Sequence, residues 1–520
     1  MEQQQPIRYP VGVQNFDKIM EEGYLYADKT GLIYSLTHEY DYVFLSRPRR
    51  FGKSLLASTL RFYFEGRRDL FKGLEIEKLE KDWTRHPVIH LSLASIKERD
   101  VPAIKQQIAN NLNRIENQFE LESKNDITSG DRLMDIIISC HKKYEKKAVV
   151  IIDEYDAPLL NNLSGDNLSE VRDMMRALFA PLKDCLEHIR FVFITGITKF
   201  SQLSIFSELN NLENISMNPR YAAICGITQH ELETQFSDGV DAMARQQECS
   251  RRQLLEKLKN YYNGYRFAKS GEAVYNPFSL IRALKDRDFN LYWFETGTPT
   301  FIIETMKRFN TRITDIESRD IDAQDFDTPT EGMTSAIPLI YQSGYITIKS
   351  YDRLTNSYTL GFPNNEVKVG FMRLLLATLA NNNEYTPSQT MIRIIRPILA
   401  DDIDGALKFL QRYLKSIPYQ EGTRNSEGHY TALLYVIFTL TCDYVQSQVR
   451  TSDGRIDILL TTGRRNYLME LKLNGSAQQA LEQIDSKDYP LAVTNDLPTL
   501  RVGINFSTET GTISEWIIKE

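Results

Sequence analysis

Cysteine is scarce in this sequence, and the few cysteines present lie far apart. The chain of 520 residues has five of them and no C-x-x-C pair. An odd, scattered set argues against a disulfide framework and against a zinc site built from cysteines. This composition therefore fits a reducing cytoplasm.

Long apolar runs and an excess of basic charge are also missing. The longest strongly apolar run, ALLYVIFTL at 432–440, is too short to span a bilayer. The N-terminal stretch MEQQQPIRYPVGVQNF lacks the charged and apolar regions of a signal peptide. The formal net charge is -7 and the sequence pI is about 5.7, so no global positive field attracts nucleic acid. We expect a soluble intracellular protein that contacts nucleic acid, if at all, through local patches.

Strand and helix patterns alternate through residues 1–225. Four short apolar runs rich in Val, Ile and Phe are separated by longer amphipathic stretches, such as 102–120 and 168–187. This alternation predicts a parallel sheet buried between helices. The predicted strands are YVFLS (42–46), PVIHLSL (87–93), KAVVIID (147–153) and RFVFITG (190–196).

The rest of the chain gives a less regular pattern. Residues 226–290 read as mainly helical and carry many Tyr and Phe residues. Further along, the pattern predicts a hairpin closed by Thr355-Asn356 and a helix over 401–416. The polar stretch PYQEGTRNSEG (418–428) predicts a domain boundary.

The segment LSRPRRFGKSLL (45–56) ends as a nucleotide-binding loop does but does not begin as one. Gly52-Lys53-Ser54 fits the end of the P-loop pattern, whereas Arg47 stands where the first glycine is expected. A strand precedes the loop and a helical pattern follows it, which is the context that such a loop needs. Lys53 would then reach the β- and γ-phosphates and the Ser54 hydroxyl would bind Mg²⁺. The alternative is a chance tripeptide at a helix start.

Two carboxylates about 100 residues later weaken that alternative. The run AVVIIDEYD places Asp153 and Glu154 at the end of a buried strand, where unpaired charges are costly. Asp153 can hold the Mg²⁺ shell and Glu154 can polarise an attacking water. After the next strand, Thr195 and Thr198 could sense the γ-phosphate or merely cap a helix, and the sequence leaves both roles open.

These motifs resemble those of the bacterial and archaeal AAA-ATPase-like proteins, over about residues 8–515. The resemblance implies that R-P-R-R-F-G-K-S is that family's normal Walker A loop, and that a nuclease-like domain follows the ATPase. Pro48 can stiffen the loop, and the arginines add positive charge near the phosphates. The segments that carry the resemblance are YADKT, SRPRRFGKSL, IIDEYDAPL, TGITKFS, IFSELNNL, YNGYRF and VYNPFSL. The expected nucleotide-binding residues are Arg49, Arg50, Phe51, Gly52, Lys53, Ser54, Leu55, Asp153 and Thr195.

The stretch GRIDILLTTGRRNYLMELKL (454–473) contains a second candidate site. A two-residue turn at Gly463-Arg464 would place Asp457 directly opposite Glu470 in an antiparallel pair. One face of the hairpin would then be apolar, and the other would carry Asp457, Glu470 and Lys472. Two carboxylates can bind Mg²⁺, and the lysine can orient or help deprotonate a water. The alternative is a surface hairpin with an ordinary lysine–carboxylate pair.

The D…E-x-K order and spacing resemble those of PD-(D/E)XK nucleases. Glu427 opens a predicted helix, where that superfamily often places a further acidic residue. Gln483, one turn after Gln479, fits the glutamine of the superfamily's Q-x-x-x-Y element. Lys487 stands where the tyrosine belongs and Tyr489 comes two positions later, so the role of this helix stays open.

We therefore expect an α/β protein, with a P-loop NTPase parallel sheet, a helical lid and a C-terminal restriction-endonuclease-like α/β domain. The favoured function is ATP-regulated, Mg²⁺-dependent cleavage of nucleic acid, with DNA favoured over RNA. No membrane contact is expected, and homo-oligomer formation is left open. The alternatives are a regulatory or signalling ATPase whose nuclease-like domain only binds, and a nucleotide-gated scaffold.

The expected domains are the ATPase (1–225), the helical lid (226–290), a middle region of uncertain fold (291–417) and the nuclease-like domain (418–520). The expected catalytic residues are Glu154, Asp457, Glu470 and Lys472. The expected metal ligands are Ser54, Asp153, Asp457 and Glu470.

Overall fold

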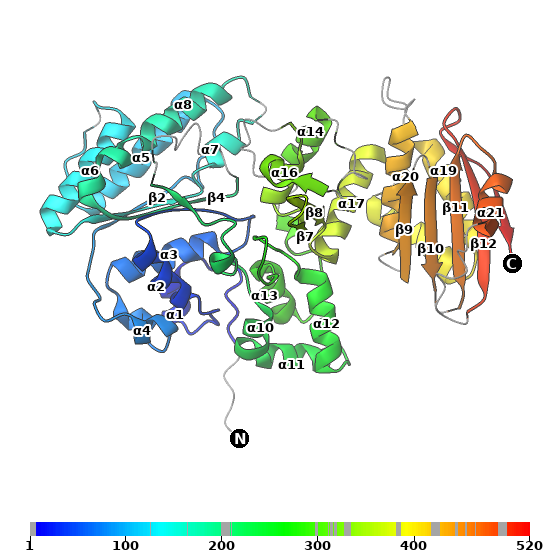
Figure 1. Cartoon of the computed structure of the whole chain (residues 1–520), viewed down its shortest axis with the longest axis horizontal. Coiled ribbons are helices and arrows are strands. Elements are labelled where there is room, and N and C mark those ends of the chain that lie inside the picture. Colours follow the sequence, from blue (N-terminus) through cyan, green and yellow to red (C-terminus); the bar gives the residue numbers. More distant parts are fainter. Residues whose placement is uncertain are drawn as a thin grey trace. The chain divides into compact units, whose positions relative to one another are not determined.

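A parallel sheet organises the N-terminal part of the chain in the computed structural model (Figure 1). Its five strands have the order β2-β3-β4-β1-β5. The four predicted strands are present, because Val, Ile and Phe suit a sheet that is buried on both faces. They are β1 (Tyr42–Ser46), β2 (Val88–Ser92), β3 (Ala148–Asp153) and β4 (Ile189–Gly196), and the short β5 (Glu213–Asn214) completes the sheet.

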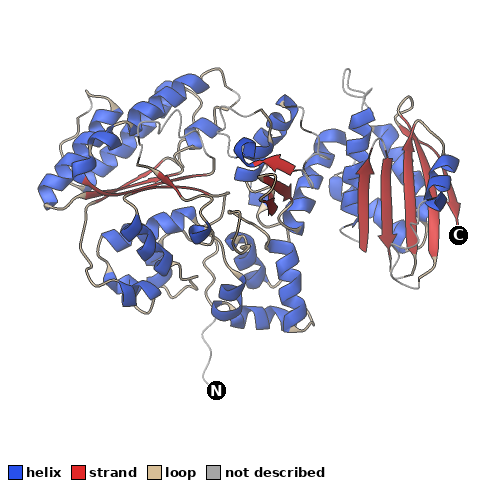
Figure 2. Ribbon diagram, in the orientation of Figure 1, coloured by secondary structure: helices blue, strands red, loops and turns tan. Residues whose placement is uncertain are grey.

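Helices cover both faces of this sheet, as Figure 1 shows and the colours of Figure 2 separate. The first face carries α5 (Val101–Gln118), α6 (Ser129–Tyr144), α8 (Leu168–Phe179) and, further along, α7 (Ala157–Leu160) and α9 (Pro181–Asp184). The second face carries α1 (Phe16–Glu21), α2 (Thr30–Glu39), α3 (Lys53–Phe64) and α4 (Glu75–Leu79). The amphipathic stretch 168–187 forms α8 and α9, which are separated at Pro181, whose ring and missing N–H interrupt a helix.

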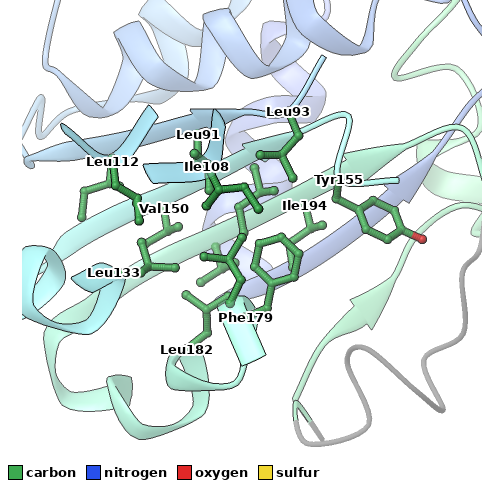
Figure 3. Close-up of a cluster of buried hydrophobic side chains, with 14 of the residues drawn as sticks. Leu91, Leu93, Ile108, Leu112, Leu133, Val150, Tyr155, Phe179, Leu182 and Ile194 are labelled. Carbon is green, nitrogen blue, oxygen red and sulfur yellow. The ribbon is translucent and has the colours of Figure 1, made fainter. Parts of the chain in front are cut away.

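The core on the first face joins strands to helices through aliphatic side chains (Figure 3). Leu91 and Val150 of the sheet lie in one cluster with Ile108 of α5, Leu133 of α6 and Phe179 of α8. Each such side chain stabilises the fold by about 1.5–3 kcal/mol when it is fully buried. This packing fixes the carboxyl ends of β1, β3 and β4, where the predicted nucleotide residues lie.

Residues 226–290 form helices, as predicted. Thr228 with Glu231, and Ser250 with Gln253, make capping boxes that satisfy the N–H groups at two helix starts. An apolar cluster holds the group together, and Tyr262 is fully buried in it. The helices are α10 (Gln229–Gln235), α11 (Ser237–Gln246), α12 (Arg251–Tyr262) and α13 (Pro277–Asp286).

A small antiparallel sheet of order β6-β8-β7 follows. The predicted hairpin is present, but its strands pair Asp352 with Ser357, so four residues (353–356) form the turn instead of two. The Asp352 carboxylate accepts hydrogen bonds from the Leu354 N–H and the Thr355 hydroxyl, which stabilises the longer turn. The elements of this region are α14 (Thr300–Arg308), β6 (Asp320–Asp322), α15 (Ala323–Phe326), α16 (Ile337–Gln342), β7 (Thr347–Asp352) and β8 (Ser357–Gly361).

A second sheet organises the C-terminal part, with five strands in the order β13-β12-β11-β10-β9. Only β11 and β12 run parallel, and the other neighbours are antiparallel. The strands are β9 (Gln446–Ser452), β10 (Arg455–Thr461), β11 (Asn466–Leu473), β12 (Thr499–Ser507) and β13 (Thr512–Lys519). The helices are α17 (Asn365–Ala380), α18 (Pro387–Leu399), α19 (Ile403–Ser416), α20 (Glu427–Cys442) and α21 (Ala477–Ser486). The helix predicted over 401–416 is α19.

The chain divides into two units, Met1–Thr311 with Ser318–Glu366, and Arg312–Glu317 with Val367–Glu520. The second unit thus takes in most of α17 together with α18 and α19, ahead of the boundary predicted at 418–428. None of the described helices is long and apolar enough to cross a membrane.

The structure describes all residues except 1–6, 125, 164, 199–208, 210, 297–299, 310, 312–315, 317–319, 327–333, 381–385, 418–426, 443–445, 453–454, 463 and 487–496. Side chains are also left undescribed at 300–301, 324–325, 427–431, 442, 446–452 and 455–457.

Candidate functional site

The turn from β1 into α3 has the backbone of a phosphate-binding loop. Gly52 caps α3 in a left-handed conformation, with φ 88°, which glycine adopts without steric cost. Arg50, two residues earlier, is also left-handed, with φ 65°. The helix then begins at Lys53, so its first N–H groups and the positive end of its dipole point back at the loop.

Arg47 anchors the start of this loop from within the protein. Its side chain is 1% exposed, and its guanidinium donates to the backbone carbonyls of Ser46, Ser216 and Tyr221. It also lies 4.1 Å from the centre of the Phe267 ring. The expectation that all the loop arginines add charge near the phosphates is therefore wrong for Arg47, whose Nη1 and Nη2 groups donate inside the fold.

Two further contacts fix the rest of the loop. The Phe51 ring is buried edge-on against Tyr265, with ring centres 4.7 Å apart, and also contacts Phe267. The Trp293 indole N–H donates to the Arg49 carbonyl at 3.0 Å. Side-chain contacts thus stabilise the bent conformation of this loop. A glycine-rich loop would adopt such a conformation through its backbone flexibility alone.

A cavity of about 540 Å³ opens beside the loop. The predicted residues Arg49, Arg50, Gly52, Lys53, Ser54, Leu55 and Glu154 all line it. Its other walls come from the segment 10–14, from the turn after β3, and from Phe278 and Ile281 of α13. The Arg50 guanidinium lies 5.1 Å from the centre of the Phe278 ring, so α13 contributes to the position of that charge. Sequence reasoning did not assign the segment 10–14 or α13 to this site.

Lys53 is the buried cation of the cavity. Its ammonium donates to the carbonyls of Arg47 and Pro48, at 3.0 Å each. Burial lowers the pKa of Lys53, and the negative charges of Glu154 and Asp153 oppose that shift. The lysine therefore donates to the loop backbone and interacts electrostatically with the carboxylates at the end of β3.

Asp153 ends β3 and is almost fully buried. Burial raises its pKa, while the Ser54 hydroxyl and the charge of Lys53 act in the opposite direction. Its Oδ1 atom is buried and has no hydrogen-bond partner. An unpartnered carboxylate oxygen near a hydroxyl is a donor set that suits Mg²⁺, so these residues fit the ion.

Glu154 follows in a left-handed conformation, with φ 53°, which is uncommon for a residue other than glycine. Such strain persists where the surrounding structure fixes it, often at functional sites. Here it occurs at a residue that lines the cavity.

The structure does not bring Thr195 to the cavity. The Thr195 hydroxyl donates to the Leu45 carbonyl at 2.9 Å, inside the sheet, and the residue is fully buried. The Thr198 hydroxyl donates to Asp156 at 2.7 Å. Asp156 itself lines the cavity, and sequence reasoning missed it. Its position three residues after Asp153 in the D-E-Y-D run was the available signal.

An apolar recess of about 80 Å³ adjoins the cavity. The two share Pro10, Gly52, Leu55, Pro277 and Ile281. The recess continues over residues 25–27 and 224–227, and over Phe51 and Phe236. Phe51 thus lies beside the recess and not in the cavity itself.

The C-terminal hairpin has the predicted register, with Asp457 opposite Glu470. Thr462 and Arg465, which flank the expected turn, are joined by a backbone hydrogen bond of 3.0 Å, while Gly463 lies outside the described residues. Ile458, Met469 and their neighbours on one face are buried, as expected.

The other face of the hairpin is also covered, which the sequence analysis did not predict. Leu468 packs with Leu481 and Ile484 of α21, and Glu470 on the same face is 1% exposed. The Lys472 ammonium donates to Glu470 at 3.2 Å and to the side-chain carbonyl of Gln483. Glu470, Lys472 and Gln483 therefore form one polar cluster beneath α21.

Several predicted residues of this second site lie outside the described part of the structure. The side chains of Asp457 and Glu427 are undescribed, although Glu427 does begin α20, and Lys487 and Tyr489 lie in an undescribed segment. Within the described part of the chain, no group of three or more His, Cys, Asp or Glu residues is placed to hold a metal ion. The carboxylate of Glu470 remains a suitable donor for Mg²⁺.

Comparisons with known proteins match both parts of the chain. A family model described as predicted AAA-ATPase matches residues 10–206, and a model of the PD-(D/E)XK nuclease superfamily matches residues 425–516. A protein of Azotobacter chroococcum mcd 1, described as an uncharacterized protein in the vnfD 5' region, is 33% identical over 527 residues. That alignment covers 98% of this chain and 99% of the relative. The solved ORC2 protein of Aeropyrum pernix, in ADPNP and ADP complexes, matches with a TM-score of 0.26 and 10% identity. It covers 70% of this chain and 92% of that chain, a likeness too weak to carry an argument.

Proposed function

Because this chain belongs to the family of predicted AAA-ATPases with a C-terminal domain of the PD-(D/E)XK nuclease superfamily, we propose that it hydrolyses ATP to regulate nucleic-acid cleavage. The observation that carries the ATPase half is the convergence of Lys53, Ser54 and Glu154 on one cavity. The cavity lies at the carboxyl ends of parallel strands, where α/β proteins bind their ligands.

The triphosphate would lie along the start of α3. Lys53 would exchange its two carbonyl partners for oxygens of the β- and γ-phosphates, and Arg49 and Arg50 would add positive charge nearby. When bound, Mg²⁺ would offset phosphate charge, and Ser54 and Asp153 are the residues that would hold it. Glu154 would orient and polarise the attacking water.

The base of the nucleotide would occupy the apolar recess. The recess joins the cavity at Gly52 and Leu55, so a nucleotide whose phosphates lie on α3 can extend into it. Its lining of Leu25, Ile224 and Phe236 favours a flat apolar ring over a charged group. Ile281 of α13 lines both spaces, so the lid would close over the bound nucleotide.

The polar cluster under α21 would act on the nucleic acid. Glu470, with Asp457 across the hairpin, would supply carboxylate oxygens to a divalent ion that polarises the scissile phosphate. Lys472 would position the attacking water, and its contact with Gln483 holds the ammonium in place. DNA is the favoured substrate.

A continuous set of contacts supports the regulatory half of the proposal. Trp293 donates its indole N–H to the Arg49 carbonyl and its backbone N–H to Glu366 Oε1, at 3.0 and 2.7 Å. Glu366 lies in the first turn of α17, which continues into the second unit. A shift of the loop on nucleotide binding or release would therefore act directly on the start of that helix.

One experiment tests the whole proposal. Single- and double-stranded DNA and RNA are incubated with the full chain in Mg²⁺ or Mn²⁺, with and without ATP. We expect metal-dependent cleavage whose rate changes with ATP in the wild type, and no cleavage with Lys472→Ala. In Glu154→Gln, ATP should still change the cleavage rate but should not be consumed. ATP hydrolysis without cleavage of any substrate would favour a domain that only binds nucleic acid.

A further inference from the structure

Asp156 connects the turn after β3 to the loop that leaves β4. It is 1% exposed, and its Oδ2 atom accepts three hydrogen bonds. They come from the N–H groups of Ile197 and Thr198, at 2.9 and 2.7 Å, and from the Thr198 hydroxyl at 2.7 Å. One carboxylate oxygen thus fixes the first two residues after β4.

The second oxygen, Oδ1, has no such partner. It is buried without a hydrogen bond, although the residue lines the cavity with Lys53, Ser54 and Glu154. A buried carboxylate oxygen without a donor is energetically unfavourable. We therefore expect a donor to reach Oδ1 when the site is in use.

The position of this carboxylate is tightly constrained. A Cβ atom at residue 196, a glycine, would lie 2.6 Å from Asp156 Oδ1 and 2.7 Å from the Tyr155 ring. Gly196 is therefore needed for the close approach of the two loops. The Lys53 ammonium donates to the carbonyls of Arg47 and Pro48, and no hydrogen bond joins it to Oδ1 in this structure.

We propose that Asp156 is a positioning residue whose Oδ1 accepts a hydrogen bond from water in the hydration shell of nucleotide-bound Mg²⁺. Mg²⁺ keeps several waters when it binds to protein, and such water is a strong donor. Oδ2 of the same side chain holds Ile197 and Thr198. Binding of Mg²⁺ with the nucleotide would therefore affect the position of the loop after β4. This inference rests on the proposed ATP site and adds a sensor of the metal to it.

Asp156→Asn tests the roles of the two side-chain oxygens separately. The amide oxygen can replace Oδ2 toward its three donors, whereas the NH₂ group in place of Oδ1 cannot accept a hydrogen bond. ATP affinity is measured by calorimetry for both proteins, in Mg²⁺ and in EDTA. We expect the gain in affinity that Mg²⁺ gives to fall about tenfold in the variant. Binding without Mg²⁺ should be unchanged or tighter, since a negative charge near the phosphates is lost.

Thr198→Val is the matched control, because it removes one donor from Oδ2 and leaves Oδ1 untouched. The increase in ATP affinity that Mg²⁺ gives to this variant should stay within about twofold of that of the wild type. The inference would be overturned if Mg²⁺ raised the ATP affinity of Asp156→Asn as much as that of the wild type. It would also be overturned if the variant lost ATP affinity equally with and without Mg²⁺. The proposed ATP site would stand in both cases. Absence of ATP binding by the wild type would instead overturn the proposed function.

A wild-type measurement keeps the inference testable if Asp156→Asn does not fold. Amide hydrogen exchange at Ile197 and Thr198 is compared for the free protein, with ATP in EDTA, and with ATP in Mg²⁺. We expect added protection at these amides only when ATP and Mg²⁺ are both present. Equal protection with and without Mg²⁺ would contradict a link between the metal and this loop.

Discussion

Arg47 shapes the loop between β1 and α3 although it does not line the cavity. Burial lowers the pKa of its guanidinium to about 10, so the group stays charged at neutral pH, held by three carbonyls and the Phe267 ring. A loop fixed by buried side chains needs little ordering when a ligand binds, which favours affinity. Ser216, Tyr221 and Phe267 are far from Arg47 in sequence, so only the folded chain shows which arginine faces inward.

Lys53 is the residue on which ATP binding should depend most. Lys53→Ala removes the buried ammonium at the start of α3, and no other lysine lies at that point of the loop. We expect ATP affinity to fall at least about tenfold, since an ammonium at the β- and γ-phosphates is lost. Calorimetry measures the change, with the exposed Lys72→Ala as the control. Unchanged affinity in Lys53→Ala would place the nucleotide elsewhere.

Glu154 should be needed for hydrolysis and not for binding. Glu154→Gln keeps the size of the side chain and removes its basicity, so ATP should bind and stay intact. General-base catalysis contributes about 10²–10⁴-fold, and we expect a loss of turnover in that range. Steady-state phosphate release and a filter-binding assay for retained ATP measure the two effects separately. Wild-type turnover in this variant would show that the base is another residue.

Among the elements, those with a local pattern were predictable. β1 and β3 are short runs of Val, Ile and Phe that end at charged or polar residues, and both are strands. The cross-strand pair of Asp457 and Glu470 followed from alternation and a short turn. Both features depend only on neighbouring residues, which a sequence displays directly.

Features that depend on tertiary packing were not predictable in this way. The hairpin face that carries Glu470 was expected to gather two carboxylates and a lysine, and its packing against Leu481 and Ile484 of α21 was not predicted. Thr195 was assigned to the nucleotide, but its hydroxyl donates to Leu45 on a neighbouring strand. In each case, a residue far away in sequence supplies the partner that decides where the side chain lies.

The two faces of the C-terminal hairpin should respond differently to substitution. Lys472→Ala removes a partly buried ammonium of the polar cluster, so we expect cleavage to stop while the domain stays folded. Ile458→Asp puts a charge on the apolar face, where Ile458 is fully buried, and should unfold the domain. Circular dichroism and the cleavage assay together distinguish these results. A folded Ile458→Asp protein beside an unfolded Lys472→Ala protein would reverse our assignment of the faces.

Ile281 of α13 should affect recognition of the base more than recognition of the phosphates. Ile281→Trp places a larger ring where Ile281 borders both the recess and the cavity. We expect ATP affinity to fall about tenfold, because the recess of about 80 Å³ would be filled. Tripolyphosphate, which has no base, should bind as it does to the wild type. Equal losses for both ligands would argue against a base in the recess.

At the scale of the whole molecule, Glu366 is the last residue of the first unit and lies in the first turn of α17, which continues into the second unit. Its carboxyl group is fully buried, and burial raises its pKa to about 8, although the Trp293 N–H that it accepts acts in the opposite direction. At neutral pH the side chain is therefore mostly protonated, and its ionisation would place a charge beside Trp293. The link from Arg49 through Trp293 to α17 is for this reason expected to be sensitive to pH.

This pKa gives a prediction with a definite sign. Glu366 is protonated in the folded and the unfolded chain well below pH 4.5. As the pH rises from about 4.5 to 8, the unfolded chain loses this proton while the folded chain keeps it, so the free energy of unfolding decreases. The slope from this one group is at most about 1.4 kcal/mol per pH unit, and above the folded pKa it vanishes.

Glu366→Gln isolates that contribution, since glutamine accepts the Trp293 hydrogen bond and does not titrate. The melting temperature of the full chain is measured for both proteins between pH 5 and 9. We expect the wild type to lose stability relative to the variant from pH 5 to 8, and the difference to level off above that. Glu256→Gln removes an exposed carboxylate of α12, which is not among the groups that shift the pKa of Glu366, so its difference from the wild type should stay flat. A flat difference for Glu366→Gln as well would mean that Glu366 ionises normally, and the link between loop and helix would then not respond to pH.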